Sequence, residues 1–318
     1  MKLIQELIDK NKCLALMGPT ASGKSQLSMD LASVLPVEII SVDSALIYKG
    51  MDIGTAKPSA KELREVPHHL IDTHDPLETY SASEFVEEVH LLVEQVFARG
   101  KLPVLVGGTM MYYNALQQGM NELPAADECI RATLQQFWQE SPEKLHQRLE
   151  CIDPESALRI HPNDPQRLIR ALEVYEISGK TLTQLRAEPK HALTAFKLIK
   201  IGLIPEDRAK LHAQIGKRFE TMLERGFLSE VKSLLERDDL TVDATSMRSV
   251  GYRQACFFLM GEYDYDMFVH KGLVATRQLA KRQLTWLRKE SDLIKIDPYQ
   301  TTQKERLALL LDILKSSV

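Results

Sequence analysis

The chain has 318 residues, of which 44% are hydrophobic and 26% charged, a composition typical of a globular protein with one large domain or two modest ones. Its net charge of −4 excludes a polybasic protein that binds nucleic acid through overall charge. Any nucleic-acid surface must therefore arise from local clustering of lysine and arginine.

The four cysteines, at positions 13, 129, 151 and 256, are far apart and form no C-x-x-C pair. This spacing fits neither a zinc site nor a disulfide framework, so reduced, buried thiols are expected. The first 18 residues carry Glu6 and Asp9 and are unlike a signal peptide, and no later segment has the length of a membrane span. We expect a cytoplasmic protein without membrane association.

Three short apolar runs indicate a parallel α/β core. Residues 12–17, 37–42 and 102–106 are each typical of a buried strand. A helix is expected over 82–99, with Ser81 or Ser83 as its N-cap and Gly100 at its end. Strands that alternate with helices at these lengths predict a parallel sheet with crossover helices.

The segment 116–199 lacks convincing strands and is predicted to be a helical insertion. Its helices are broken at prolines 124, 142, 154, 162 and 165. A strand is expected again over 196–204, and the remainder is expected to be helical. We therefore predict one α/β core made of residues 1–115 and 200–318, interrupted by the insertion.

Residues 18–25, GPTASGKS, fit the phosphate-loop pattern G-x-x-x-x-G-K-[ST] in full, between a predicted strand and a predicted helix. Glycines let backbone N–H groups converge on phosphate oxygens at the positive end of the helix. Lys24 adds a charge, and the Ser25 hydroxyl suits a magnesium ion that bridges two phosphates. A chance glycine-rich turn is the alternative, which this setting disfavours. The loop indicates a diphosphate but no particular reaction.

Asp43 directly follows the second strand, at the sheet edge where open parallel sheets bind ligands. It could act on a substrate held beside Lys24, or it could cap a helix that begins near Ala45. The third strand ends in Val106-Gly107-Gly108-Thr109, without the carboxylate that usually completes the magnesium site of an NTPase. This argues against a motor or a switch protein and leaves a kinase open.

Local positive charge occurs between residues 248 and 289, where eight Lys or Arg residues face three acidic ones. On a helix over 277–289 the basic side chains share one arc, and apolar ones, including Trp286, lie opposite. The basic arc could follow phosphates, although a solvated face is the simpler interpretation from composition alone. Trp286 and Tyr112 are expected in the core, and His68 and His69 in a loop rather than in a metal site.

Several motifs closely resemble those of the bacterial tRNA dimethylallyltransferase (IPP transferase) family, in the family's order and over nearly the whole chain. They are GPTASGKS (18–25), SVDSALIYKGMDIGTAKP (41–58), LVGGTMMYY (105–113), HPNDPQRLIRALEV (161–174), RSVGYRQ (248–254) and TRQLAKRQLTWLR (276–288). The resemblance implies a P-loop NTPase-like α/β core with a parallel sheet. It also implies transfer of a dimethylallyl group from dimethylallyl diphosphate to the exocyclic amino nitrogen of adenosine 37 of tRNA, next to the anticodon, with release of diphosphate.

The resemblance also implies a magnesium cofactor, a monomer, and an insertion that grips the anticodon stem–loop. It assigns Asp43 as the general base, with Thr109, Lys24 and Arg218 as further catalytic residues. The donor diphosphate is expected on Gly18, Pro19, Thr20, Ala21, Ser22, Gly23, Lys24 and Ser25, with Ser25 also on magnesium. The tRNA is expected on Asp43, Ser44, Ala45, Leu46, Thr109, Arg131, Gln166, Arg167, Leu168, Ile169, Arg170, Arg248, Ser249, Val250, Gly251, Tyr252, Arg253, Lys281, Arg282, Gln283, Leu284, Thr285, Trp286, Leu287 and Arg288.

Two other functions fit parts of the sequence. One is a small-molecule kinase or related ATP-dependent enzyme, which would share the phosphate loop and an acceptor-binding aspartate. The other is a P-loop RNA-binding protein without turnover. The basic helix argues against the kinase, and the position of Asp43 argues against a passive binder.

Overall fold

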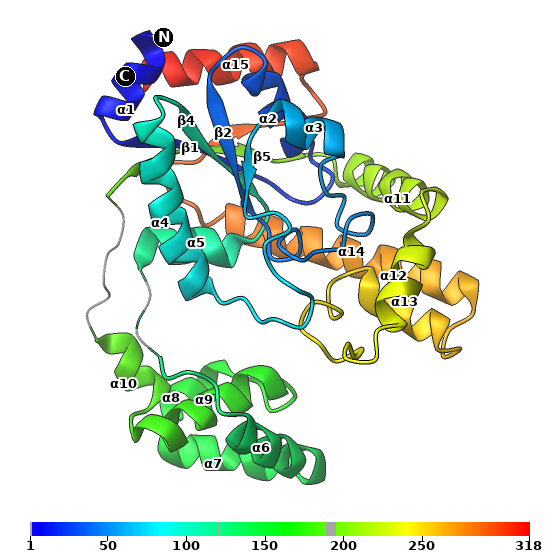
Figure 1. Ribbon diagram of the computed structural model, residues 1–318. Helices are drawn as coiled ribbons and strands as arrows, with labels where there is room; N and C mark the ends of the chain where they lie inside the picture. Colours follow the sequence, from blue (N-terminus) through cyan, green and yellow to red (C-terminus); the bar gives the residue numbers. More distant parts are fainter. Residues whose placement is uncertain (1, 120, 122, 189–194) are drawn as a thin grey trace. The chain divides into compact units, whose positions relative to one another are not determined.

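The computed structural model describes residues 2–119, 121, 123–188 and 195–318. The chain forms two compact units, one made of Met1–Leu116 with Thr194–Val318 and the other of Gln117–Leu193 (Figure 1). Residue 1 of the predicted core and residues 120, 122 and 189–194 of the predicted insertion lie outside the described residues.

The first unit is built on a parallel sheet, as predicted. In chain order its strands are β1 (Lys12–Met17), β2 (Val37–Val42), β3 (His68–His69), β4 (Leu102–Gly107), β5 (Lys197–Leu203) and β6 (Ile294–Ile296). In the sheet they lie in the order β3-β2-β4-β1-β5-β6, and all neighbouring pairs are parallel. The strands β3 and β6 were not predicted. The expectation that His68 and His69 lie in a loop is wrong, because they pair with Ile39 and Ile40 at one edge of the sheet.

The central strands consist almost entirely of apolar residues because both of their faces are covered. Leu14, Ile39 and Val104 belong to a buried cluster with side chains of α1 (Lys2–Asp9), α2 (Lys24–Ala32) and α15 (Gln303–Ser316). The helix α4 (Ala82–Ala98) packs against β2 and β4. It begins at Ser81, where Ser81 and Glu84 form a capping box, which confirms the predicted start.

A second apolar cluster lies beside the sheet, around α11 (Arg208–Glu224), α12 (Phe227–Leu235), α13 (Tyr252–Leu259) and α14 (Tyr265–Leu287). Side chains of these helices pack against Ile47, Tyr48 and Met51, which follow β2 in the chain. This cluster therefore holds the long connection after β2 against the helices. The remaining helices of the unit are α3 (Ala60–Glu65) and α5 (Met110–Gln118).

The second unit is helical, with a core of its own around Leu145, Leu168 and Leu172. Its helices are α6 (Glu128–Glu140), α7 (Pro142–Ile152), α8 (Pro154–Arg159), α9 (Pro165–Ser178) and α10 (Leu182–Ala187). Pro142, Pro154 and Pro165 each stand in the first turn of a helix, where the missing N–H costs nothing. Three of the five prolines predicted to break helices thus mark where helices begin.

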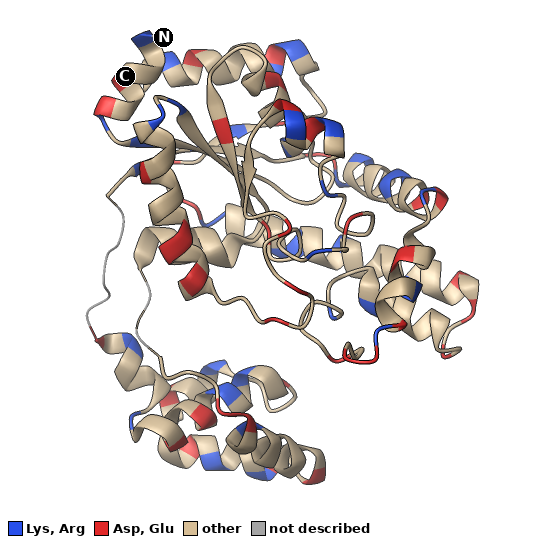
Figure 2. Cartoon of the chain, viewed as in Figure 1, with Lys and Arg blue, Asp and Glu red and all other residues tan. Residues whose placement is uncertain are grey.

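All four cysteines are free, but only Cys13 and Cys256 are buried, so the expectation of burial is wrong for Cys129 and Cys151, which are exposed. Among the described residues no helix is long and apolar enough to cross a membrane. Acidic and basic residues are mixed along the chain (Figure 2), consistent with its small net charge.

A buried carboxylate ties the sheet to its surroundings. Glu38 of β2, whose side chain is 3% exposed, pairs with His69 and Arg99 at 2.7 Å and with Lys101 at 3.1 Å. Burial alone would raise the pKa of Glu38, but hydrogen bonds from Arg99, His69 and Lys101 lower it to about 2. The ionised carboxylate therefore stabilises the fold.

We expect Glu38→Gln to lower the free energy of unfolding by about 2–3 kcal/mol at pH 7, since one pKa unit corresponds to about 1.4 kcal/mol. Because the pKa of Glu38 is depressed in the folded state, its contribution is fully present above pH 4.5 and is lost as the pH falls toward 2. Urea unfolding at pH 7, 5 and 3.5 measures this. Glu65→Gln, which alters an exposed carboxylate, is the control. A difference between Glu38→Gln and wild type that stays constant with pH would contradict the prediction.

Candidate active site

The phosphate loop connects β1 to α2 at the carboxyl edge of the sheet. Its backbone turns through the left-handed region at Ala21 (φ 63°) and at Gly23 (φ 88°), which directly precedes α2. Glycine adopts this conformation at no steric cost. Gly23 has no side chain to cap α2, so the first N–H groups of this helix are suited to an anionic ligand.

Lys24 points back into this loop. Its Nζ donates hydrogen bonds to the carbonyl oxygens of Gly18 (2.9 Å) and Pro19 (2.7 Å). Burial of the ammonium group, together with the nearby positive charge of Arg218, lowers the pKa of Lys24 to about 7, while Asp43 opposes this shift. A bound diphosphate would be an anionic partner for Lys24 and would stabilise its charged ammonium form.

Arg218 of α11 brings a second positive charge to the loop. Its Nη1 donates to Thr20 Oγ1 (3.0 Å) and its Nη2 to the carbonyl oxygen of Thr55 (3.1 Å). Burial lowers the pKa of this guanidinium, and Asp43 counteracts the shift. Within the described residues neither Lys24 nor Arg218 forms an ion pair with a carboxylate. Two partly buried cations beside a phosphate loop favour binding of a polyanion.

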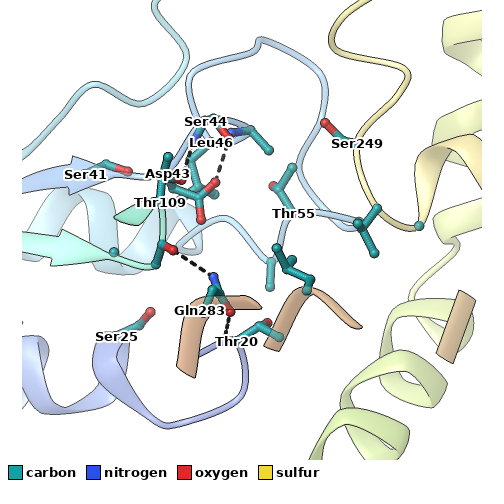
Figure 3. A pocket seen from close by; sticks show the side chains of 18 of the residues that line it. Thr20, Ser25, Ser41, Asp43, Ser44, Leu46, Thr55, Thr109, Ser249 and Gln283 are labelled. Atoms are coloured by element: carbon teal, nitrogen blue, oxygen red, sulfur yellow. Dashed lines mark hydrogen bonds between the residues drawn. The ribbon is translucent and has the colours of Figure 1, made fainter. Parts of the chain in front are cut away.

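Asp43 lies immediately after β2, and its Oδ1 accepts a hydrogen bond from the N–H of Ala45 (2.9 Å). The alternative in which Asp43 caps a helix is wrong, because residues 44–47 form a turn. Thr109 fixes this turn from the end of β4, since its Oγ1 accepts from the N–H of Ser44 (3.1 Å) and its own N–H donates to the Val42 carbonyl (3.2 Å). Asp43 and Thr109 are therefore held next to each other (Figure 3).

Gln283 of α14 links the end of β4 to the phosphate loop. Its Oε1 accepts from the N–H of Thr20 (2.8 Å), and its Nε2 donates to the Gly108 carbonyl (2.9 Å). The same side chain thus contacts both the donor-side loop and the residue before Thr109 (Figure 3). The basic helix predicted from the sequence contributes a neutral amide at this point.

These groups line one cavity of about 580 Å³ within the first unit. The predicted residues that line it are Thr20, Lys24, Ser25, Asp43, Ser44, Ala45, Leu46, Thr109, Arg218, Arg248, Ser249, Val250, Gly251, Tyr252, Arg282, Gln283 and Trp286. Sequence reasoning missed Thr55, although it lies in the most specific motif, and the apolar wall of Ile215, Phe219 and Met222, which shows only as ordinary helix periodicity.

Trp286 is 43% exposed and lines the cavity, so the expectation that it lies in the core is wrong. The expectation is right for Tyr112, which is 2% exposed and stacks on Phe85. The helical wheel misplaced Trp286 because periodicity does not show which elements cover each face of α14, which packs against α11 and α13. Leu284 and Leu287 are buried, whereas Arg253, Lys281, Thr285 and Arg288 are exposed outside the cavity lining.

The other predicted tRNA contacts belong to the second unit. Arg131 and Arg170 both pair with the buried Glu173, at 3.1 and 2.8 Å, and Arg167 pairs with Asp164 at 2.7 Å. Leu168 and Ile169 are buried in the core of this unit, so Gln166 and Arg167 supply the exposed side chains of that segment.

The oxygen atoms in the cavity fit a hard divalent cation that is shared with a diphosphate. Ser25 and Asp43 line the cavity, and so does Ser41, whose buried Oγ has no hydrogen-bond partner among the described residues. The described residues contain no group of three or more His, Cys, Asp or Glu side chains that could enclose a metal. Magnesium is commonly held in this way, by few protein oxygens together with phosphates and water.

The fold and the cavity define a P-loop α/β protein with two cations and an aspartate in one cavity. Its sequence matches the family model described as IPP transferase over residues 46–290. It is 62% identical over 314 residues to the tRNA dimethylallyltransferase of Hydrogenovibrio crunogenus. This match covers 98% of this chain and 97% of the relative. It is 55% identical over 281 residues to that of Neisseria meningitidis, covering 87% and 90%. The chain belongs to the IPP transferase family.

Solved structures agree with this assignment. The crystal structure of a tRNA isopentenylpyrophosphate transferase from Bacillus halodurans matches with a TM-score of 0.69 and 36% identity, over 96% of this chain and 98% of that one. A eukaryotic dimethylallyltransferase captured acting on tRNA matches with a TM-score of 0.79 and 27% identity, over 96% and 80%. Both confirm the predicted P-loop NTPase-like α/β fold with a parallel sheet.

We expect Lys24→Ala to weaken binding of inorganic diphosphate by at least about tenfold, because a hydrogen bond to a charged group contributes about 1.5–3 kcal/mol. Ser25→Ala should instead reduce the gain in affinity that magnesium provides. Calorimetric titration with diphosphate, with and without magnesium, measures both effects. Lys10→Ala, which alters an exposed lysine of the N-terminal segment, is the control. Wild-type affinity in Lys24→Ala would contradict the assignment of the phosphate loop.

Proposed function

We propose that this protein transfers a dimethylallyl group from dimethylallyl diphosphate to the exocyclic amino nitrogen of adenosine 37 of tRNA and releases diphosphate. Relatives that are 62% identical over 314 residues and 55% identical over 281 residues are named tRNA dimethylallyltransferases. The observation that carries the proposal is the meeting of Asp43, Lys24, Arg218 and Thr109 in one cavity. This arrangement offers a base for the acceptor and positive charge for the leaving group.

Asp43 is the general base in this proposal. The amino nitrogen of adenine is a weak nucleophile because its lone pair is delocalised into the ring, and it becomes acidic as the new C–N bond forms. A carboxylate within hydrogen-bond reach can accept that proton and typically contributes about 10²–10⁴-fold in rate. The backbone hydrogen bond from Ala45 fixes the orientation of the carboxylate. Thr109, whose Oγ1 already accepts from Ser44, can donate its hydroxyl proton at the acceptor side.

Lys24, Arg218 and the N–H groups of the phosphate loop stabilise the departing diphosphate. As the allylic C–O bond breaks, negative charge accumulates on the oxygens that these groups contact. Enzymes of this family use a divalent cation, and we assign it as magnesium, held by Ser25 and by diphosphate oxygens. When bound, this ion neutralises further charge on the leaving group.

The apolar wall of the cavity protects the allylic carbon. This carbon carries partial positive charge in the transition state, so water in the site would compete with the adenine. Ile215, Phe219 and Met222 supply an apolar surface beside Arg218, the residue that contacts the phosphate loop. We assign the prenyl group to this wall.

The acceptor is a base in a single-stranded hairpin loop, because unstacking such a base costs little. Arg248 and Arg282, both exposed at the cavity, would contact the phosphates around it. Arg131, Gln166, Arg167 and Arg170 of the helical unit would grip the anticodon stem–loop, while Leu168 and Ile169 support them from the core. We also assign the protein to the cytoplasm. We assign it as a monomer, because the groups that line the cavity come from one chain.

Mass analysis of tRNA nucleosides tests the proposal. Incubation of purified protein with unmodified tRNA, dimethylallyl diphosphate and magnesium should add one dimethylallyl group to adenosine 37, and chelation of the metal should suppress it. Substituting ATP for the donor should give neither a modified nucleoside nor phosphate release. ATP turnover without prenylation would contradict the proposal and favour a kinase.

Asp43→Asn should reduce single-turnover prenyl transfer by at least about 10²-fold, because the amide keeps the shape but cannot accept the proton. Affinity for tRNA should stay within a few-fold of wild type, and thermal stability should change little, since asparagine also accepts the Ala45 hydrogen bond. Rapid-quench measurement with enzyme in excess isolates the chemical step. Asp9→Asn, at an exposed position, is the matched control. Near-normal transfer by Asp43→Asn would rule out the general-base role.

A further inference from the structure

Glu230 of α12 lies just behind the cavity and accepts four hydrogen bonds from other segments. Its Oε2 accepts from the backbone N–H groups of Asp52 (2.9 Å) and Ile53 (2.6 Å), and its Oε1 from the N–H of Gly54 (3.1 Å). The fourth donor is the hydroxyl of Tyr252, at 2.5 Å from Oε1. Three consecutive N–H groups that converge on one anion form a nest, here filled by a side chain.

One end of this network leads to the donor side of the cavity. The residue after the nest, Thr55, accepts through its carbonyl oxygen the Nη2 hydrogen bond of Arg218, whose Nη1 contacts Thr20 of the phosphate loop. Gly54 and Thr55 both line the cavity, whereas Glu230 does not. The position of residues 52–55 therefore sets where the Arg218 guanidinium lies.

The other end leads to the proposed tRNA side. Tyr252 begins α13 and is fully buried, and it directly follows the cavity-lining residues 248–251. Because its hydroxyl is bound to the same carboxylate oxygen as the N–H of Gly54, the two segments are fastened to one group.

Packing leaves this arrangement little freedom. A Cβ at Gly54 would lie 2.2 Å from Phe227 Cε2 and 2.6 Å from Tyr252 Cε2, so only glycine fits between the two rings. The buried Lys57 holds the segment that contains the nest. It pairs with Asp52 and Asp72 and donates to the Tyr48 carbonyl at 2.9 Å. Within the described residues Glu230 has no cationic partner, so its charge is met by hydrogen-bond donors alone.

We propose that Glu230 is a positioning residue that fixes Arg218 relative to the 248–252 segment and so holds the donor and tRNA sides of the cavity in register. This inference rests on the proposed function, because it concerns the two substrates of that reaction. Only a carboxylate satisfies the nest. A glutamine presents one oxygen and one N–H₂ group. Because both Glu230 oxygens accept hydrogen bonds, the N–H₂ group would face a donor and leave it without an acceptor. The Tyr252 hydroxyl supplies a second, milder point at which to break the network.

The test compares Glu230→Gln and Tyr252→Phe with Glu236→Gln, which makes the same change at an exposed position just after α12. We expect Glu230→Gln to lower kcat/KM for dimethylallyl diphosphate at least about tenfold, since small misplacements of a positioning group can cost up to about 10². Tyr252→Phe should cost about threefold, as expected for one hydrogen bond. Glu236→Gln should match wild type.

A double-mutant cycle with Arg218→Ala separates positioning from general destabilisation. If Glu230 acts through Arg218, Glu230→Gln should cost less than about threefold in the Arg218→Ala background, because the group that it positions is gone. A full and independent loss in both backgrounds would overturn the proposal. If Glu230→Gln does not fold, Tyr252→Phe carries the same cycle, and wild-type kinetics of this variant would overturn the proposal.

Hydrogen exchange and diphosphate binding keep this inference distinct from the proposed function. The amides of Asp52, Ile53 and Gly54 should be protected in wild type and should exchange faster in Glu230→Gln, with protection of the β-sheet unchanged. Affinity for inorganic diphosphate should fall with them. These results are expected even if the wild type proves inactive as a prenyltransferase, an outcome that would refute the function alone. Unchanged exchange of the three amides would refute the role of Glu230.

Discussion

The cavity depends on how closely β2 and β4 approach each other at their carboxyl ends. A Cβ on Gly107 would lie 1.9 Å from the carbonyl oxygen of Val42, so this approach is open only to glycine. The same carbonyl accepts the N–H of Thr109, whose hydroxyl in turn holds the N–H of Ser44. The strand contact thereby fixes the turn that presents Asp43. It also holds Asp43 and Thr109 in a fixed position relative to each other. Gly108 continues the constraint, because a Cβ there would meet the Gln283 amide at 2.3 Å.

Charge in the cavity is arranged so that a ligand completes it. Burial lowers the pKa of both Lys24 and Arg218, the positive charge of Arg218 lowers the pKa of Lys24 further, and Asp43 offsets the shift for both. A diphosphate between the cations would remove their repulsion, and its departure would restore it. In the proposed reaction the phosphate loop binds a leaving group, whereas P-loop kinases use it to hold a phosphoryl donor. A general motif acquires its particular chemistry from the aspartate at the neighbouring strand end and from the arginine on α11.

The sequence predicted those parts of the structure whose signal is local. The apolar runs at 12–17 and 37–42 identified buried strands, and the pattern at residues 18–25 identified the phosphate loop. The two-residue β3 and three-residue β6 could not be predicted, because their pairing depends on neighbours far away in the chain. Trp286 was misplaced for a similar reason, since a helical wheel records periodicity but not which elements cover each face. The contacts of Gln283, and those of Glu230 with the N–H groups of residues 52–54, join segments more than 170 residues apart, and no spacing rule predicts them.

Carboxylates outside the cavity that Asp43 lines also organise this protein. Glu38 binds cations at the edge of the sheet, and Glu230 binds backbone amides behind the cavity. In the helical unit, Glu173 is fully buried and binds Arg131, Arg170 and the N–H of Asp127. Burial alone would raise the pKa of Glu173, but hydrogen bonds from these groups hold it below its usual value. Arg170 also donates to the Pro124 carbonyl, so the carboxylate orders both arginines and the start of the unit. An arginine whose direction is fixed in this way loses little side-chain entropy when it meets a phosphate, which suits the proposed contact with the stem–loop.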